Sequence, residues 1–345
     1  MPLPWFAAPT PPLFLAPMSG FTGSAFRALC RAAGADVVVT EFVQSEALRR
    51  DVVRAWRDIA FDAGDRPTGI QIFGASPPSM AAAAALLAER LRPDFIDINY
   101  GCPAHNVVEH NAGARLMQTP ALAAEIASAV VAAAGAFGVP VTAKIRLGWD
   151  ARSRNAVEFA QMLADAGVAA VTVHGRTRAQ GYSGVADWEE IGRVAAALAP
   201  LPVVGNGDLR DAAGALRRWR ESGVAGLMVG RAALGNPWLF GEIKAALRGL
   251  PPPAPPTVAE RWDALENYAA ALVRGAPDKS NIRWLLPRLI PFTQNLAGAR
   301  KLRARLARCS TLADLSSEIA AARAGTTGDD AAEPATAGAA GNLPA

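Results

Sequence analysis

A cysteine in a Gly-Cys-Pro turn is the residue of this sequence best suited to chemistry. Cys102 lies in the segment Asn99-Tyr100-Gly101-Cys102-Pro103, directly after an apolar run typical of a buried strand. Most free cysteines are small buried apolar residues, but a turn at a strand end brings the thiol to the protein surface. No histidine pattern of a thiol protease accompanies it, so we interpret Cys102 as a general acid rather than a nucleophile.

Three further polar side chains end predicted strands. Gln71 offers an amide, Lys144 a fixed positive charge and His174 an imidazole. A flavin ring needs an amide for its pyrimidine edge and a positive charge near N1 and O2. The three residues together therefore favour a flavin site, although each one alone could simply bind a neighbouring loop.

Two glycine-rich segments indicate a phosphate site. Gly205-Asn206-Gly207-Asp208 and Gly230-Arg231 each follow a predicted strand. Small residues expose backbone N–H groups to a phosphate, and an arginine adds a charged contact. The alternative is that these glycines only close tight turns.

Composition excludes several classes of protein. The chain has 345 residues and three cysteines, too few for a disulfide framework, and no long uncharged apolar run that would span a membrane. His105 and His110 flank Glu109 without a further set of ligands, so we expect no metal site. The proline-rich N-terminus has no basic region typical of a secretory signal. We expect a monomer in the cytoplasm.

These residues must be positioned by a repeating framework of strands and helices. Eight short apolar runs alternate with alanine-rich helical stretches over about 235 residues, a pattern typical of a (β/α)8 TIM barrel. A doubly wound sheet is the alternative, but no glycine-rich dinucleotide turn follows the first run. The eight predicted strands are 13–16, 37–40, 69–72, 95–98, 141–145, 170–173, 203–205 and 227–229.

The barrel pattern ends near Leu250. Residues 251–256 form a proline-rich linker, and 257–324 predict an all-helical domain with helices at 257–274, 281–296, 297–306 and 312–323. From Arg283 to Arg308 there are seven basic residues and no acidic one, which suits a nucleic acid but also a solvated helix face. We expect residues 325–345 to be a disordered tail.

The motifs as a set resemble those of the tRNA-dihydrouridine synthases, flavin enzymes that reduce uridine in tRNA. The resemblance runs from about Pro9 to Leu306 and is nearest to the bacterial B-type branch. It rests on segments in the order of the family: Ala16-Pro17-Met18, Gln71-Ile72-Phe73-Gly74, Asp97-Ile98-Asn99-Tyr100-Gly101-Cys102-Pro103, Lys144-Ile145-Arg146-Leu147-Gly148-Trp149, His174-Gly175-Arg176-Thr177-Arg178, Gly205-Asn206-Gly207-Asp208 and Gly230-Arg231-Ala232.

The resemblance implies that residues 1–250 form an FMN-binding barrel and that residues 257–324 bind tRNA, with NADPH as reductant. Cys102 would give a proton to uracil C5 while reduced FMN delivers hydride to C6, and Asn99 would orient the base. The implied cofactor contacts are Pro17, Met18, Ser19, Gln71, Lys144, His174, Asn206, Gly207, Asp208, Gly230 and Arg231. The expected tRNA contacts are Arg176, Arg178, Arg283, Arg300, Lys301, Arg303 and Arg305.

Two other functions remain compatible with these residues. One is an FMN-dependent dehydrogenase of a free pyrimidine, of the dihydroorotate or dihydropyrimidine type. The other is a non-catalytic RNA-binding regulator that reuses the barrel. The basic helical domain argues against the first, because a small substrate does not need it. The retention of Cys102, Lys144 and His174 argues against the second.

Overall fold

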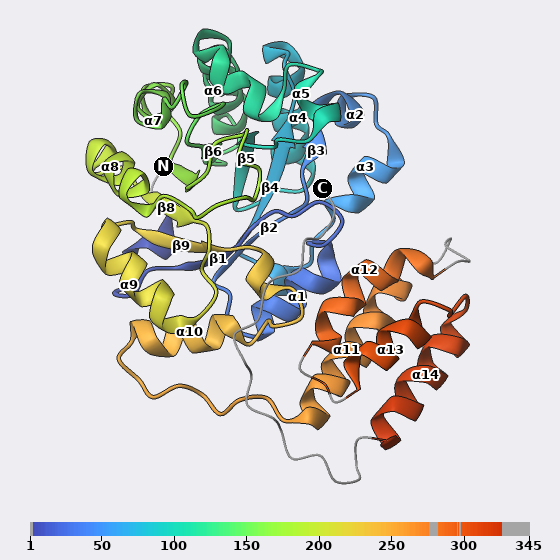
Figure 1. Cartoon of the computed structure of the whole chain (residues 1–345). Coiled ribbons are helices and arrows are strands. Elements are labelled where there is room, and N and C mark those ends of the chain that lie inside the picture. Colours follow the sequence, from blue (N-terminus) through green and yellow to red (C-terminus); the bar gives the residue numbers. More distant parts are fainter. Residues whose placement is uncertain (1–2, 276–281, 295, 297, 326–345) are drawn as a thin grey trace. The chain divides into compact units, whose positions relative to one another are not determined.

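The chain forms a closed parallel β-barrel, with further helices beyond residue 257 (Figure 1). The computed structural model describes residues 3–275, 282–294, 296 and 298–325. One compact unit holds the described residues up to Ala233 together with Trp238–Pro253. A second unit holds Leu234–Pro237 and the described residues from Ala254 onward. Among the described helices, none is both long and apolar enough to cross a membrane.

Eight parallel strands close the barrel, in agreement with the predicted barrel pattern. Each strand pairs with its neighbours, β2 pairs with β4, and the pairing of β1 with β9 completes the ring. The short strand β3 (Val43–Gln44) pairs in addition with the end of β4. The eight strands are β1 Leu13–Leu15, β2 Val37–Val39, β4 Thr68–Phe73, β5 Phe95–Tyr100, β6 Val141–Arg146, β7 Ala170–His174, β8 Val203–Asn206 and β9 Gly226–Val229.

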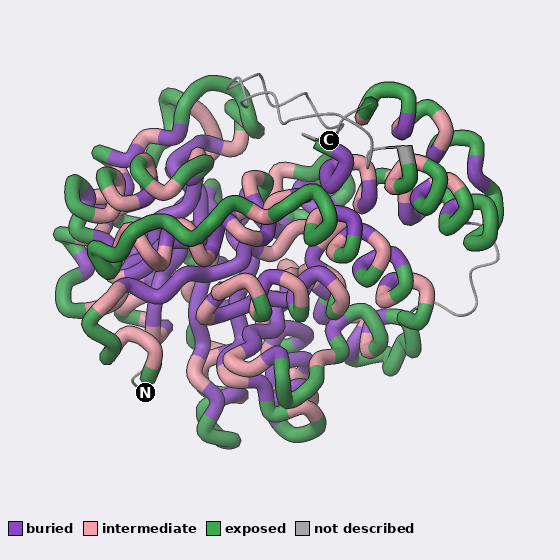
Figure 2. The backbone as a smooth tube through the Cα atoms, turned by 90° about the horizontal axis from the view of Figure 1, so that it is seen from below, coloured by how far each residue is buried: buried purple, intermediate pink, exposed green. Residues whose placement is uncertain are grey.

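The strands are apolar because both of their faces are covered. Helices pack on the outside, and side chains of the other strands fill the inside, so the strands are buried along nearly their whole length (Figure 2). The run Val37–Val39, with three β-branched residues, is an example of the sequence that such a strand requires.

Helices connect the strands, and some of them begin at a residue whose side chain caps the helix. Asp187 accepts the Glu190 backbone N–H at 3.0 Å, and Asp211 accepts that of Gly214 at 2.6 Å. Gly223 ends α9 with φ +65°, a left-handed conformation that favours glycine. The connecting helices are α1 Ser24–Ala32, α4 Pro77–Arg90, α6 Pro120–Gly135, α7 Ala156–Asp165, α8 Trp188–Leu198, α9 Ala212–Ser222 and α10 Leu239–Leu247.

Several short elements were not predicted from the sequence. Helices α2 (Ser45–Arg49) and α3 (Val53–Asp58) follow β3, and α5 (His105–Val108) follows β5. A 3₁₀ turn, Pro4–Ala7, packs against the barrel core, where Trp5 lies 5.4 Å from the ring of Phe95. Phe95 begins β5, so this turn covers the amino ends of the strands and leaves the carboxyl ends for a site.

The second unit is helical. The stretch predicted to be helical over 281–296 is helical from residue 283 to residue 293, but as a 3₁₀ turn at Arg283–Leu285, α12 (Leu286–Leu289) and another 3₁₀ turn at Ile290–Thr293 rather than as one α-helix. Pro287 and Pro291 explain the interruption, because proline has no N–H to donate and its ring clashes with the preceding turn. The other helices are α11 Val258–Arg274, α13 Ala299–Leu306 and α14 Leu312–Gly325. The predicted tail beyond residue 325 lies outside the described residues.

Candidate active site

The barrel topology gathers the predicted site residues at one end. In a parallel barrel the carboxyl ends of all strands lie on the same face. The strand register sets neighbours side by side: Asn99 lies opposite Lys144. His174 lies between Arg146 on one side and Asn206 on the other. Residues that are far apart in the sequence therefore lie side by side on neighbouring strands. We call this set the polar row: Asn99, Lys144, Arg146, His174 and Asn206.

Cys102 sits on a turn that is held by the preceding strand. The side chain of Asn99 accepts backbone N–H groups from Gly101 at 3.0 Å and from Cys102 at 2.8 Å. Gly113 (φ +59°) closes against this turn, since a Cβ there would lie 2.9 Å from the Cys102 carbonyl oxygen. Burial raises the pKa of the Cys102 thiol, more than the nearby charges of Arg146 and Lys144 lower it. The thiol therefore stays protonated at neutral pH, as a proton donor must.

Gln71 is fully buried, and both ends of its amide are engaged. Its Nε2 donates to Asp97 at 2.7 Å, and its Oε1 accepts from Asn99 Nδ2 at 2.8 Å. A contact between Gln71 and a cofactor would use the second hydrogen of Nε2 or the second lone pair of Oε1. Sequence reasoning missed Asp97, although the residue stands in the same motif as Asn99 and Cys102.

Lys144 places a cation in the middle of the polar row. Its Nζ donates to Asn206 Oδ1 at 3.1 Å, and Asn206 in turn donates to the Met228 carbonyl at 2.7 Å. Burial, and next the charge of Arg146, lowers the pKa of Lys144 to about 8. Among the described residues its amine has no other hydrogen-bond partner, so two N–H groups remain for a ligand.

His174 is buried and neutral. Burial, followed by the charges of Arg146 and Lys144, holds the pKa of its imidazole well below the usual range. The side chain can therefore contribute a hydrogen bond to a ligand at neutral pH, but not a charge.

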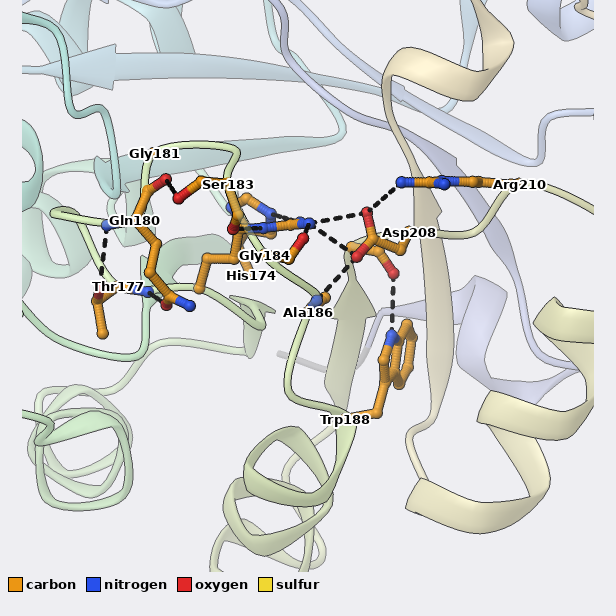
Figure 3. A network of polar contacts seen from close by, with 12 residues as sticks. His174, Thr177, Gln180, Gly181, Ser183, Gly184, Ala186, Trp188, Asp208 and Arg210 are labelled. Carbon is orange, nitrogen blue, oxygen red and sulfur yellow. Dashed lines mark hydrogen bonds and ion pairs between the residues drawn. The ribbon is translucent and has the colours of Figure 1, made fainter. Parts of the chain in front are cut away.

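Arg176 and Asp208 join the loops that follow β7 and β8, and Figure 3 shows Asp208 with its neighbours Ala186 and Arg210. Arg176 is 1% exposed, and its guanidinium donates to the carbonyl groups of Ser183 and Gly184 as well as to Asp208. The expectation that Arg176 contacts tRNA is therefore corrected, because no part of the group is left at the surface. Asp208 also accepts the backbone N–H of Ala186 at 2.8 Å, so its carboxylate organises loops rather than approaching a phosphate of the same charge.

The expected phosphate residue Arg231 lies exposed beyond β9. Its guanidinium stacks 4.1 Å from the ring centre of Tyr182 and, within the described chain, pairs with no carboxylate. Neighbouring Gly230 lies near the first loop, because a Cβ there would be 3.8 Å from the sulfur of Met18. Met18 and Pro17 are partly buried and Ser19 is exposed, so this loop still offers surface to a ligand.

Arg146 and Tyr182 are further site residues that the sequence did not single out. Arg146 is buried and donates to the carbonyl groups of Gly101, at 2.7 Å, and Thr177, at 2.9 Å. Its place two residues after Lys144 is a usable signal, because alternate residues of a strand share a face. The ring of Tyr182 comes from the loop that Arg176 holds.

The expected RNA contacts differ in how far their side chains are exposed. Arg178 is partly buried and stacks 4.4 Å from the centre of the Trp149 ring. In the second unit Arg283, Arg300 and Lys301 are exposed and Arg303 is partly so. Arg305 bonds to the carboxylate of Glu318, an acidic partner outside the basic segment 283–308.

The part of the chain that the structure describes brings no three His, Cys, Asp or Glu side chains together where they could hold a metal ion. His105 and Glu109 do meet, at 3.1 Å, but both are exposed and form a pair along one helical turn.

Comparisons with known proteins identify relatives over most of the chain. A family model described as dihydrouridine synthase (Dus) matches residues 14–325. A probable tRNA-dihydrouridine synthase of Rhodobacter capsulatus is 44% identical over 265 residues, covering 76% of this chain and 80% of that protein. The tRNA-dihydrouridine synthase B of Pseudomonas aeruginosa is 40% identical over 318 residues, covering 90% of this chain and 91% of that one.

A likeness among solved structures extends to a protein of distant sequence. A complex of 2-naphthoyl-CoA reductase matches with a TM-score of 0.54 at 10% identity, covering 69% of this chain and 50% of that one. At this identity the likeness supports the fold alone.

Proposed function

The chain belongs to the dihydrouridine synthase family, and on that premise we propose that it reduces the C5–C6 double bond of uridines in tRNA to give 5,6-dihydrouridine. The observation that carries the proposal is the Cys102 thiol, which burial keeps protonated on a turn bound by Asn99. A positioned acid of this kind is what the reaction requires at C5.

We propose FMN as the cofactor and NADPH as its reductant. Two groups of the barrel fit a flavin: Lys144, with two unused N–H groups in the polar row, and Arg231, with an exposed guanidinium that has no carboxylate partner among the described residues. Lys144 would lie at the ring and Arg231 at the phosphate, with Gly230 and the loop of Pro17, Met18 and Ser19 beside it. When bound, FMN supplies the hydride for uracil C6.

The residues of the chain then have separate tasks. Cys102 would give its proton to C5, and the nearby cations Lys144 and Arg146 would stabilise the thiolate that remains. Asn99 has a second Nδ2 hydrogen with which it could hold the base. His174, being neutral, would contribute a hydrogen bond to the cofactor.

Binding of tRNA is proposed for the helical region 257–324 and for one residue of the barrel. A uridine in folded tRNA must be drawn out of its stack, which costs a few kcal/mol, and contacts to the RNA backbone must offset that cost. The candidate contacts are Arg178, Arg283, Arg300, Lys301, Arg303 and Arg305. We also propose that the protein acts in the cytoplasm and that it is a monomer.

The test is a direct assay of product. The purified protein is incubated with FMN, NADPH and unmodified tRNA transcripts, and dihydrouridine is measured by mass spectrometry of the digested RNA. We expect dihydrouridine with wild type, and formation about 10²–10⁴-fold slower with Cys102→Ala. If wild type reduces a free pyrimidine but leaves tRNA unchanged, the dehydrogenase alternative replaces the proposal.

A further inference from the structure

A series of buried hydrogen bonds runs from the barrel interior to the turn of Cys102. Thr142 Oγ1 donates to Asp97 Oδ1 at 2.6 Å, and Gln71 Nε2 donates to Asp97 Oδ2 at 2.7 Å. Asn99 Nδ2 then donates to Gln71 Oε1 at 2.8 Å. At the end of the series, Asn99 Oδ1 accepts the backbone N–H groups of Gly101 and Cys102.

The two amides of this series could each point either way, but Asp97 permits only one direction. Asp97 Oδ2 accepts, so the nitrogen of Gln71 must face it and the oxygen of Gln71 must face Asn99. That arrangement turns the nitrogen of Asn99 toward Gln71 and its oxygen toward the turn. Reversing either amide would set two donors or two acceptors against each other in a buried place, which is costly.

We propose that Asp97 is a positioning residue that fixes the orientation of the Asn99 amide, and thereby the backbone of Cys102, for the proton transfer described above. The functional part of this inference rests on the proposed function. The positional part does not, since it concerns hydrogen bonds within the chain.

The positioning role requires the acceptor at Oδ2 and not the negative charge. Asp97 is 3% exposed, and burial raises the pKa of its carboxyl group. If Asp97 takes up a proton on Oδ1, that proton can be donated to Thr142 Oγ1, and Oδ2 still accepts from Gln71. The series therefore keeps its direction in both protonation states.

Two substitutions separate the acceptor from the charge. Asp97→Asn and Asp97→Leu both remove the charge and keep the branching at Cγ, and leucine is the larger of the two. Asparagine can keep its oxygen toward Gln71 while Thr142 accepts from its nitrogen, whereas leucine offers Gln71 no acceptor. We expect the Leu variant to lose the order of the turn and the Asn variant to retain it.

The measurement is amide hydrogen exchange by mass spectrometry on peptides that contain Gly101 and Cys102. We expect exchange at these amides to be about tenfold faster or more in Asp97→Leu, and within about threefold of wild type in Asp97→Asn. Thr40→Val is the control, because it removes a buried bond to the backbone N–H of Gln71, at 3.3 Å, and one to the Glu41 carbonyl, at 2.9 Å, and leaves the side-chain bonds of the series in place. We expect it to leave the turn as protected as in wild type.

Equal acceleration in both Asp97 variants would overturn the proposal, because the charge would then be the cause. No acceleration in Asp97→Leu would overturn it as well. If that variant does not fold, Gln71→Met can be used instead, because it removes the bonds of Gln71 to Asp97 and Asn99 and leaves Asp97 in place. Unchanged exchange at Gly101 and Cys102 in this variant would count against the proposal. These outcomes do not depend on dihydrouridine formation, so a failure of the proposed function would be recognised separately in the product assay.

Discussion

The Nη2 atom of Arg176 donates to both carboxylate oxygens of Asp208, at 3.0 and 2.8 Å, and so ties the loop after β7 to the loop after β8. Each loop directly follows a strand that ends in a residue of the candidate site, His174 in β7 and Asn206 in β8. The pair therefore holds these two loops together beside the candidate site.

We predict that Arg176→Met destabilises the protein by about 3–5 kcal/mol, because removing one partner of a buried ion pair leaves the other charge uncompensated. Arg210 is the matched control. It is 3.6 Å from the same Asp208 but largely exposed, so Arg210→Met should cost about 1 kcal/mol or less. Urea unfolding of the two variants measures the difference, and equal destabilisation would contradict the structural role of Arg176.

We predict that Cys102→Ala binds FMN and accepts electrons from NADPH as wild type does, but reduces tRNA about 10²–10⁴-fold more slowly. The reason is that the substitution removes the proton for C5 and leaves Lys144 and Arg231 in place. Stopped-flow absorbance separates the two half-reactions. Flavin reoxidation by tRNA at the wild-type rate would show that Cys102 is not the acid. Cys30→Ala, at a buried cysteine in α1, is the control for removal of a thiol elsewhere.

The pKa of about 8 at Lys144 predicts opposite effects of pH on stability and on cofactor binding. An unfolded lysine keeps its proton to about pH 10.4, so between about pH 8 and 10 the unfolded chain binds more protons than the folded one. The free energy of unfolding should rise with pH in this window, by at most about 1.4 kcal/mol per pH unit from this group. Affinity for FMN should fall over the same window, because the cation is lost.

The measurement for Lys144 is a comparison with Lys144→Met, in which both effects should vanish. Denaturant unfolding of the apoprotein and FMN titration at several pH values supply the two differences. A difference between wild type and variant that stays constant from pH 8 to 10 would mean that Lys144 does not titrate there.

We predict that Arg231→Ala weakens FMN binding by about 1.5–3 kcal/mol, the usual contribution of a charged hydrogen bond. Riboflavin has no phosphate, so its binding should change little in the same variant. Fluorescence titration with both flavins tests the assignment. Equal weakening for FMN and riboflavin would indicate that Arg231 acts through Tyr182 rather than on the phosphate.

We predict that alanine at Arg300, Lys301 and Arg303 lowers the salt dependence of tRNA binding, by about 0.7–0.9 in log–log slope for each RNA phosphate that is no longer bound. Arg305→Ala should have a smaller effect, because Glu318 already binds that guanidinium. Arg217→Ala and Arg220→Ala, two positions on α9 in the barrel unit, are the controls. The measurement is tRNA affinity over a series of salt concentrations. Equal log–log slopes for wild type and the triple variant would indicate that the basic segment is a solvated face.

The barrel and the places of its polar residues follow from the amino-acid sequence alone. Buried parallel strands need nearly continuous apolar runs, so strands such as Val37–Val39 can be recognised from the sequence. The carboxyl ends of all barrel strands lie on the same face, whatever the details of packing. The positions of Cys102, Lys144 and His174 at or just after strand ends are therefore enough to group them in one site. The stretch predicted to be helical over 281–296 is divided into an α-helical turn between two 3₁₀ turns, because Pro287 and Pro291 interrupt a regular α-helix although the apolar spacing continues through them.

The bonding partner of each polar group, in contrast, is set by the three-dimensional packing. Arg176 and Arg178 are two residues apart and identical in type, yet one is buried against Asp208 and the other stacks on Trp149. Asp97 gains a role because strand register sets it beside Gln71, a partner 26 residues away in the sequence. A hydrogen bond depends on distances of about 3 Å and on burial, and these are properties of packing between strands and loops that residue type and spacing do not specify.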